Sequence, residues 1–291
     1  MIAYAANLAT LVAIFGILAA TLNFIIGFAG IFSVAHAVFF GLGAYAGAQV
    51  ALLLFPDALL ACIAAAVVAG GLSLCLALPA LRVRGEYFVA ASLGLQMMAT
   101  TLFAEAKPLT GGIGGLVAIP RPTLFGVEVG VLPIALCALA LILFLTARLQ
   151  HGAFGRTLQS IRDAESAAEA LGKNVAAAKT LAVAFACAGA GIGGALFALH
   201  LSFVNVESFT MDQSVLVMAM VIIGGTGTLW GPIVGAIILL SLPAGLAFMP
   251  FIPPTEVGAV QQIIYGLAMT LLMIFRPAGL VGDLSKGRTT A

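Results

Sequence analysis

Residues 1–56 read MIAYAANLATLVAIFGILAATLNFIIGFAGIFSVAHAVFFGLGAYAGAQVALLLFP, and none of them carries a charge. A helix needs about 20 apolar residues to cross the hydrocarbon core of a bilayer, so this stretch is long enough for two crossings. Its apolar residues are continuous and do not alternate with polar ones, which disfavours the strands of a membrane barrel. The stretch therefore predicts two spanning helices, and we interpret the first as a retained helix, not a cleaved signal peptide.

The rest of the chain has the same character. Of the 291 residues, 63% are hydrophobic and 8% are charged, whereas an ordinary soluble domain carries about 25% charged residues. This composition excludes an ordinary soluble enzyme, a disordered chain and a disulfide-stapled secreted domain. The net charge of +1 disfavours a nucleic-acid partner. Further charge-free runs cover residues 58–81, 87–104, 129–147, 180–206, 213–255 and 257–275.

These runs predict the fold class. The run at 213–255, like the first, is long enough for two crossings, and each of the others holds one. We expect an all-α integral membrane protein, a polytopic helical bundle of nine spans with Gly/Pro-broken segments. Eight spans is the alternative, if one glycine-broken segment enters the membrane and returns on the same side.

Lysine and arginine predict the orientation. With nine spans and a cytoplasmic C-terminus, the inward regions are 82–86, 148–179 and the tail 276–291, and they hold 10 of the 12 basic residues. Only Lys107 and Arg121 face outward. An excess of basic residues is typical of cytoplasmic loops. We therefore expect a single transmembrane domain over 1–291, with a cytoplasmic loop at 148–179 and a cytoplasmic C-terminal tail.

The segment 148–179 holds 8 of the chain's 23 charges. Apolar residues recur in it at steps of three and four, which predicts a helix over Arg156–Gly172 that ends at the glycine. Its shallow apolar face consists of Leu158, Ile161, Ala164, Ala168, Leu171 and Val175, and its charged rim of Arg156, Arg162, Glu165 and Glu169. Such a face suits a groove on a soluble partner. The alternative is a helix that lies on the inner membrane surface, which its acidic residues disfavour.

Two glycine-rich segments interrupt the apolar runs. Residues 222–232 read IIGGTGTLWGP and residues 25–32 read IIGFAGIF, and they share Ile-Ile-Gly, two residues and Gly. The shared pattern is either a repeat remnant or a chance match in a glycine-rich chain. Broken helices often line the substrate path of transporters, so the first segment makes Gly224, Gly225 and Gly227 candidate pathway residues. The alternative is a short turn between two spans.

Polar side chains within the spans are further candidates for the pathway, because polar groups at this depth usually face a cavity or the bundle interior. We single out Asn23, His36 and Gln96; structural hydrogen bonding is the alternative for the first two. No Asp, Glu, Lys or Arg lies deep in a span, which disfavours an ion-coupled secondary transporter. The sequence also lacks a phosphate-binding loop, a nucleophile–base pair and a His/Cys ligand cluster, so we expect neither an enzyme nor a bound metal or cofactor.

Several motifs together resemble a known family. Residues 155–174, GRTLQSIRDAESAAEALGKN, closely resemble the cytoplasmic loop of permease subunits in branched-chain amino acid ABC transporters. Within this loop Ala167-Ala168, three residues and Gly172 resemble the Glu-Ala-Ala–x3–Gly signature of ABC importer permeases, with Ser166 in the place of Glu. Other stretches that resemble the family are Asn23–Tyr45, Arg84–Tyr87, Leu109–Gly112, Gly224–Pro232 and Arg276–Leu280.

The resemblance implies a permease subunit of an ATP-driven importer in the bacterial cytoplasmic (inner) membrane, for branched-chain or related amino acids. Importers of urea, amides or aromatic acids are the alternative. It also implies a second related permease, two cytoplasmic ATPase subunits that carry ATP and Mg, and a substrate-binding protein outside. The residues that couple this chain to the ATPases would be Arg156, Ile161, Arg162, Glu165, Ala167, Ala168, Leu171 and Gly172.

Reporter fusions test the orientation. A reporter fused after Lys173 should be active as a cytoplasmic protein and one fused near Gly114 as an external protein, because of the 10-to-2 asymmetry of basic residues. An external reporter at Lys173 would contradict both the nine-span topology and the coupling role of the loop.

Overall fold

A computed structural model describes residues 2–81, 86–124, 127–247, 257–275 and 279–281. Within these ranges the predicted helical bundle is confirmed, because nine apolar helices occupy the charge-free runs. By length and composition, five of these helices can cross a membrane. The nine are α1 (Ile2–Asn23), α2 (His36–Leu53), α3 (Ala58–Leu81), α4 (Glu86–Glu105), α6 (Val131–His151), α9 (Val175–Leu201), α10 (Met211–Gly224), α11 (Gly231–Ala247) and α12 (Val257–Phe275).

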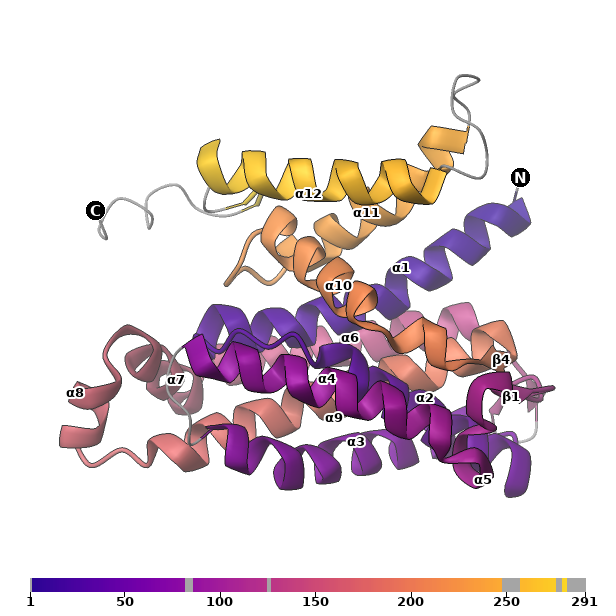
Figure 1. Ribbon diagram of the computed structural model, residues 1–291, viewed down its shortest axis with the longest axis horizontal. Coiled ribbons are helices and arrows are strands. Elements are labelled where there is room, and N and C mark those ends of the chain that lie inside the picture. The colour runs from indigo at the N-terminus through magenta and orange to yellow at the C-terminus, as the bar shows by residue number, and fades with distance from the viewer. Residues whose placement is uncertain (1, 82–85, 125–126, 248–256, 276–278, 282–291) are drawn as a thin grey trace.

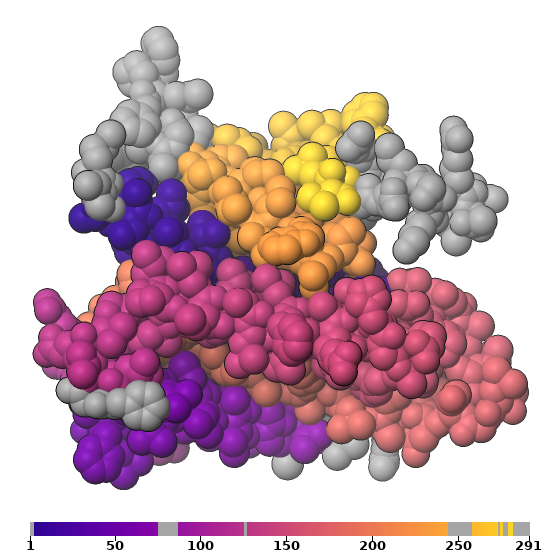
Figure 2. Space-filling model, turned by 180° about the vertical axis from the view of Figure 1, so that it is seen from behind, coloured from indigo at the N-terminus to yellow at the C-terminus, as the bar shows by residue number. Residues whose placement is uncertain are grey.

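Helix α1 lies between two groups of helices (Figure 1). On one side it contacts α10 and α11, against which α12 packs. On the other side it contacts α6 and α9, and α9 packs against α2 and α3. Figure 2 shows the opposite face, where α6, in pink, crosses the molecule between the two groups.

Short elements gather at the two ends of the bundle (Figure 1). One end, called here the strand end, has two antiparallel strand pairs with the registers Leu116↔Val204 and Thr123↔Glu128. It comprises α5 (Lys107–Thr110), η2 (Gly112–Gly114), β1 (Leu116–Val117), β2 (Thr123–Leu124), β3 (Val127–Glu128), β4 (Phe203–Val204) and η3 (Val206–Phe209). The other end, called the loop end, comprises η1 (Phe24–Ala29), which is a π-helical continuation of α1, α7 (Ala153–Asp163) and α8 (Glu165–Ala170).

The charges of the described residues divide between these ends as the sequence predicts. The loop end carries five basic residues of the segment 148–179, and the strand end carries Lys107 and Arg121. The remaining five basic residues expected on the cytoplasmic side lie outside the described residues; they are Arg82, Arg84, Arg276, Lys286 and Arg288. The distribution is the one that a membrane protein with its loop end in the cytoplasm would have.

Small residues on α9 allow its neighbours to approach its backbone. A Cβ added to Gly191 would lie 2.6 Å from the carbonyl oxygen of Ala65 in α3. A Cβ added to Gly194 would lie 2.7 Å from the nitrogen of Ala44 in α2 and would overlap the carbonyl of Phe40. Lipid tails are as apolar as the side chains, so membrane helices associate through close packing, which small residues permit. These contacts make α9 the centre of the larger helix group.

A pair of glycine substitutions tests this packing. Gly194→Ala should lower the thermal unfolding temperature of the detergent-solubilised protein, because overpacking costs about 1–3 kcal/mol. Gly71→Ala in α3 is the matched control, since a Cβ at Gly71 would have nothing within 4 Å, and helix propensity favours alanine by about 1 kcal/mol. Equal unfolding temperatures for the two variants would show that α2 and α9 are not in backbone contact at Gly194.

Candidate functional site

The loop between α6 and α9 contains two short helices where the sequence predicts one. The expected helix over Arg156–Gly172 is wrong in this respect, because Ala164 has a non-helical backbone, at φ −155° and ψ 87°, and separates α7 from α8. Side-chain contacts on both sides of the break explain it: Arg162 donates a hydrogen bond to η1, and the Glu165 carboxylate forms an ion pair with Nζ of Lys179 in α9 at 2.8 Å. Helical periodicity does not report such contacts with distant parts of the chain.

The predicted end of the helical segment at Gly172 is confirmed. Gly172 has φ +77°, a left-handed conformation that glycine adopts without a side-chain penalty. Its N–H donates to the Glu169 carbonyl at 2.9 Å, and the N–H of Lys173 donates to the Ala168 carbonyl at 3.1 Å. These two bonds form a Schellman motif, which satisfies the carbonyls at the end of α8.

The apolar stripe of the loop faces the protein's own body. Leu158, Ile161 and Ala168 are 0%, 2% and 2% exposed, so the prediction that this face meets a partner is wrong for these residues. The same stripe that would fit a partner's groove attaches the loop to the bundle, and the sequence alone does not distinguish the two uses. Leu171, by contrast, is 81% exposed, and Ala167 is also exposed.

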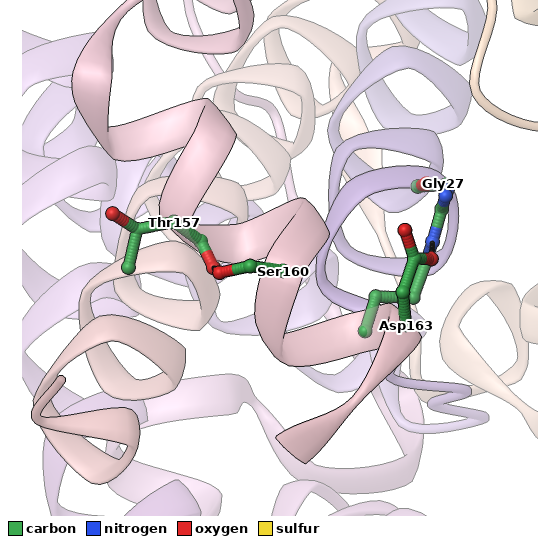
Figure 3. Close-up of polar contacts among 5 residues, drawn as sticks. Gly27, Thr157, Ser160 and Asp163 are labelled. Atoms are coloured by element: carbon green, nitrogen blue, oxygen red, sulfur yellow. Dashed lines mark hydrogen bonds and ion pairs between the residues drawn. The ribbon is translucent and has the colours of Figure 1, made fainter. Parts of the chain in front are cut away.

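Arg162 connects the loop to α1. Its Nη1 donates to the carbonyl oxygen of Gly27 at 2.5 Å, and its Nε pairs with the Asp163 carboxylate at 2.9 Å. Figure 3 shows Gly27 facing the end of α7 at Asp163, with Thr157 on the other side of the helix. The last turn of a helix leaves carbonyls without a partner in the helix, and Arg162 binds one of them. The sequence pattern predicts Arg162 on the charged rim, but in the structure part of its guanidinium turns inward.

Gly30 makes room for this arginine. Its φ of +67° is left-handed, and a Cβ added there would lie 2.6 Å from Cγ of Arg162. The other predicted rim arginine, Arg156, remains exposed, and its Nη1 donates only locally, to the His151 carbonyl at 3.2 Å. The two arginines of α7 therefore have different surroundings although both belong to the predicted charged rim.

The two glycine-rich segments meet at η1. A Cβ added to Gly27 would lie 2.6 Å from Cα of Gly227. Asn23, one helical turn before Gly27, accepts a hydrogen bond from the N–H of Gly227 at 2.8 Å and donates to the carbonyl of Thr228 at 2.7 Å. Asn23 thus bonds a neighbouring element, as the alternative interpretation of the sequence had it. We call Asn23, Gly27, Arg162, Gly227 and Thr228 the inner junction.

Residues 225–230 form a turn between α10 and α11, which is the alternative that the sequence left open. Gly225 and Gly227 have φ of +118° and +75°. Gly224 ends α10, and its carbonyl accepts from the N–H of Val281 at 3.0 Å, while the carbonyl of Ile223 accepts from Leu280 at 3.0 Å. Residues 279–281, called here the C-terminal segment, therefore satisfy carbonyls at the end of α10. On another side, η1 contacts the turn between α10 and α11.

The start of α2 lies inside the bundle and is capped by serines of other helices. The N–H of Val34 donates to Oγ of Ser92 at 3.1 Å, and the N–H of Ala37 donates to Oγ of Ser214 at 2.9 Å. Free N–H groups at the start of a helix need such partners where water and lipid supply none. The sequence does not point to either serine, because a single serine in an apolar run carries no signal of what it binds.

His36 and Gln96 take part in the same layer of polar contacts. His36 is 1% exposed and its Nε2 lies 3.0 Å from Oγ1 of Thr21. Gln96 is also 1% exposed; it donates to the Phe209 carbonyl at 2.7 Å and accepts from Ser214 at 3.3 Å. A cavity of about 20 Å³ beside His36 has room for about one water molecule. The structure thus gives each side chain a protein partner, and their pathway role stays a prediction.

The described residues contain no cluster of three His, Cys, Asp or Glu side chains that could hold a metal ion. What this region offers is a mechanical connection. The loop helices, the end of α1, the α10–α11 turn and the C-terminal segment bind one another through backbone groups and two polar side chains.

Comparison with known proteins identifies the family. Residues 4–275 match the family model described as the permease component of branched-chain amino acid transport systems. The high-affinity branched-chain amino acid transport system permease protein LivM of Escherichia coli is 30% identical over 305 aligned residues, which cover 94% of this chain and 69% of the relative. The LivM protein of Salmonella typhimurium is 29% identical with the same coverage.

A probable branched-chain amino acid transport permease protein LivM of Methanocaldococcus jannaschii is 24% identical over 143 residues, 47% of this chain and 41% of the relative. No solved structure matches the chain. The family match covers the bundle and the inner junction together. The chain belongs to the family of permease components of branched-chain amino acid transport systems.

Proposed function

We propose that this chain is one permease subunit of an ATP-driven importer for branched-chain or related amino acids. It lines the substrate pathway together with a second, related permease. Two cytoplasmic ATPase subunits hydrolyse ATP, and a substrate-binding protein delivers the amino acid from outside. Support comes from the family match over residues 4–275 and from relatives whose names specify branched-chain amino acid transport.

The observation that carries the coupling proposal is the hydrogen bond from Arg162 to the Gly27 carbonyl. Through it, a displacement of α7 reaches the end of α1. Asn23 and the close approach of Gly27 to Gly227 then transmit the displacement to the α10–α11 turn. Tightly packed backbones and charge-assisted hydrogen bonds resist deformation. We therefore expect α7, the end of α1 and the α10–α11 turn to move as one unit.

The surface that meets the ATPase in this proposal is formed by the exposed side of α8 and by Leu171, which directly follows it. Leu171 is an apolar side chain that is 81% exposed at the loop end, beside the exposed small residue Ala167 and the acidic Glu169. An apolar anchor with a charged rim is the usual composition of a protein-binding patch. Ala168 does not belong to this surface, since it is buried in the chain itself.

Substituting Arg162 tests the transmission. Arg162→Met should leave the ATPase subunits bound and hydrolysing ATP but reduce amino acid uptake per ATP. A hydrogen bond with a charged partner is worth about 1.5–3 kcal/mol, so the reduction should be about tenfold or more. Uptake and ATP hydrolysis are measured together in proteoliposomes that contain the assembled transporter.

Arg156→Met is the matched control, because it removes the same charge from the same helix without touching η1. It should keep nearly the wild-type ratio of uptake to ATP hydrolysis, because a contact of Arg156 with an ATPase, as the resemblance implies, would alter both rates together. If Arg162→Met also keeps that ratio, the bond to Gly27 does not transmit the movement. An equal loss in both variants would point to the charge of α7 as a whole and would equally contradict the proposal.

A second pair of variants tests the contact surface. Leu171→Asp should abolish copurification of the ATPase subunits, because it places a charge in the apolar centre of the contact. Leu171→Met preserves an apolar side chain of similar size and should retain them. Both should yield a folded permease, since Leu171 is exposed. Retention of the ATPases by Leu171→Asp would remove α8 from the interface.

A further inference from the structure

A groove of about 440 Å³ lies between α10 and α12. Asp212 and Gln213 lie in the first turn of α10, toward the strand end, Gln261 and Gln262 in the second turn of α12, and Tyr265 one turn later. The apolar lining residues follow along each helix: Val215, Leu216 and Ala219 in α10 and Met269 in α12. At 1.5 Å per residue, Ala219 is roughly 10 Å along α10 from Asp212. The groove thus leads from a polar mouth to an apolar interior.

Helix α12 has two different faces at the same depth. One face presents Ile263, Leu267 and Ile274, which are 68%, 58% and 68% exposed. The other face lines the groove with Gln261, Gln262 and two glycines. Polar side chains within the membrane face protein or a water-filled cavity, not hydrocarbon. The aliphatic face therefore suits lipid, and the glutamine face suits a polar occupant.

Tyr265 holds the glutamine face in place. Its hydroxyl donates to the Leu239 carbonyl of α11 at 2.8 Å and accepts a hydrogen bond from Nε2 of Gln261. The side-chain amide oxygen of Gln261 can then accept a hydrogen bond from a molecule in the groove. The carboxylate of Asp212, which is exposed, adds a negative charge at the mouth.

We infer that this groove is a binding site on the import path for a zwitterionic amino acid with an apolar side chain, an inference that rests on the proposed function. The ammonium group would bind the Asp212 carboxylate and the Gln261 oxygen. The amides of Gln213 and Gln262 would donate to the carboxylate of the amino acid. The aliphatic side chain would lie on the deeper apolar residues, where Met269 can adapt to different branching.

A second groove in this protein has a different lining and provides a comparison. It has a volume of about 500 Å³ between α3 and α6, and its residues are apolar or small, among them Leu59, Ile63 and Leu141. It offers neither a charge nor an amide to an amino acid. The α10–α12 groove combines a carboxylate, amides and apolar surface, which are the groups that an amino acid with an aliphatic side chain requires.

Transport by the assembled importer tests the site. With leucine as the probe, Asp212→Asn should lower uptake by about tenfold or more, because the ammonium loses its ionic partner. Glu207→Gln is the matched control, since this exposed carboxylate lies in η3, just before α10, and does not line the groove. It should import leucine at the wild-type rate. Wild-type uptake by Asp212→Asn would overturn the proposal.

ATP turnover separates this inference from the proposed function. If the site is correct, Asp212→Asn retains its ATPase subunits and their ATP hydrolysis while uptake falls. If the wild-type chain itself neither binds ATPases nor supports ATP-driven uptake, the proposed function is wrong. The amino acid site in the groove is then tested by the cysteine labelling described next.

Labelling of single cysteines in a background without native cysteines provides that judgement and does not depend on Asp212. Gln262→Cys should react with a membrane-impermeant maleimide added from outside, because thiols react as thiolates in contact with water. The neighbouring Ile263→Cys, on the lipid face, should react at least severalfold more slowly. Leucine should slow the labelling of Gln262→Cys. Equal reactivity, or an unreactive Gln262→Cys because a helix of the second permease fills the groove, would contradict the inference.

Discussion

The hydrogen bond from Arg162 to the carbonyl of Gly27 joins the loop to the end of α1, and the α10–α11 turn packs against the same place. Two glycines permit these contacts. Gly30 leaves room for the arginine side chain, and Gly27 allows the α10–α11 turn to approach α1. The carbonyls in the last turn of a helix have no partner within that helix, so other groups must satisfy them at the end of α1. The same constraint explains why Asn23 bonds the turn and why residues 280 and 281 bond the end of α10. The inner junction is the solution to this constraint and also the point where the loop is attached.

Helix α10 connects the junction with the α10–α12 groove. Its last residue, Gly224, belongs to the turn that η1 holds, and its first turn contributes Asp212 to the groove. The helix has 14 residues and is therefore about 21 Å long. A displacement of α7 that moves the junction would also change the position of α10 relative to α12. In the proposed importer, this geometry would link an ATPase at one end of the bundle to an amino acid near the other.

The fold class and the positions of the helices follow from the sequence because the absence of charge over about 20 residues is a strong physical signal. The left-handed end of α8 at Gly172 also follows, since glycine after a helical pattern has a local cause. What the sequence did not reveal depends on contacts between distant residues. The break at Ala164, the burial of Ala168 and the inward turn of Arg162 result from packing against α1 and α9. The serines that cap α2 are equally invisible to periodicity, because each caps a helix other than its own.

In the proposed importer, α7, the end of α1 and the α10–α11 turn move as one unit. Distances between pairs of spin labels in the assembled transporter test this most directly, with labels at the exposed positions Ser160, Thr226 and Val117. We expect the distance from Ser160 to Thr226 to be the same with and without bound ATP, while the distances from both to Val117 at the strand end change. A change in the Ser160–Thr226 distance on ATP binding would contradict it, because the inner junction would then not hold the loop to the turn.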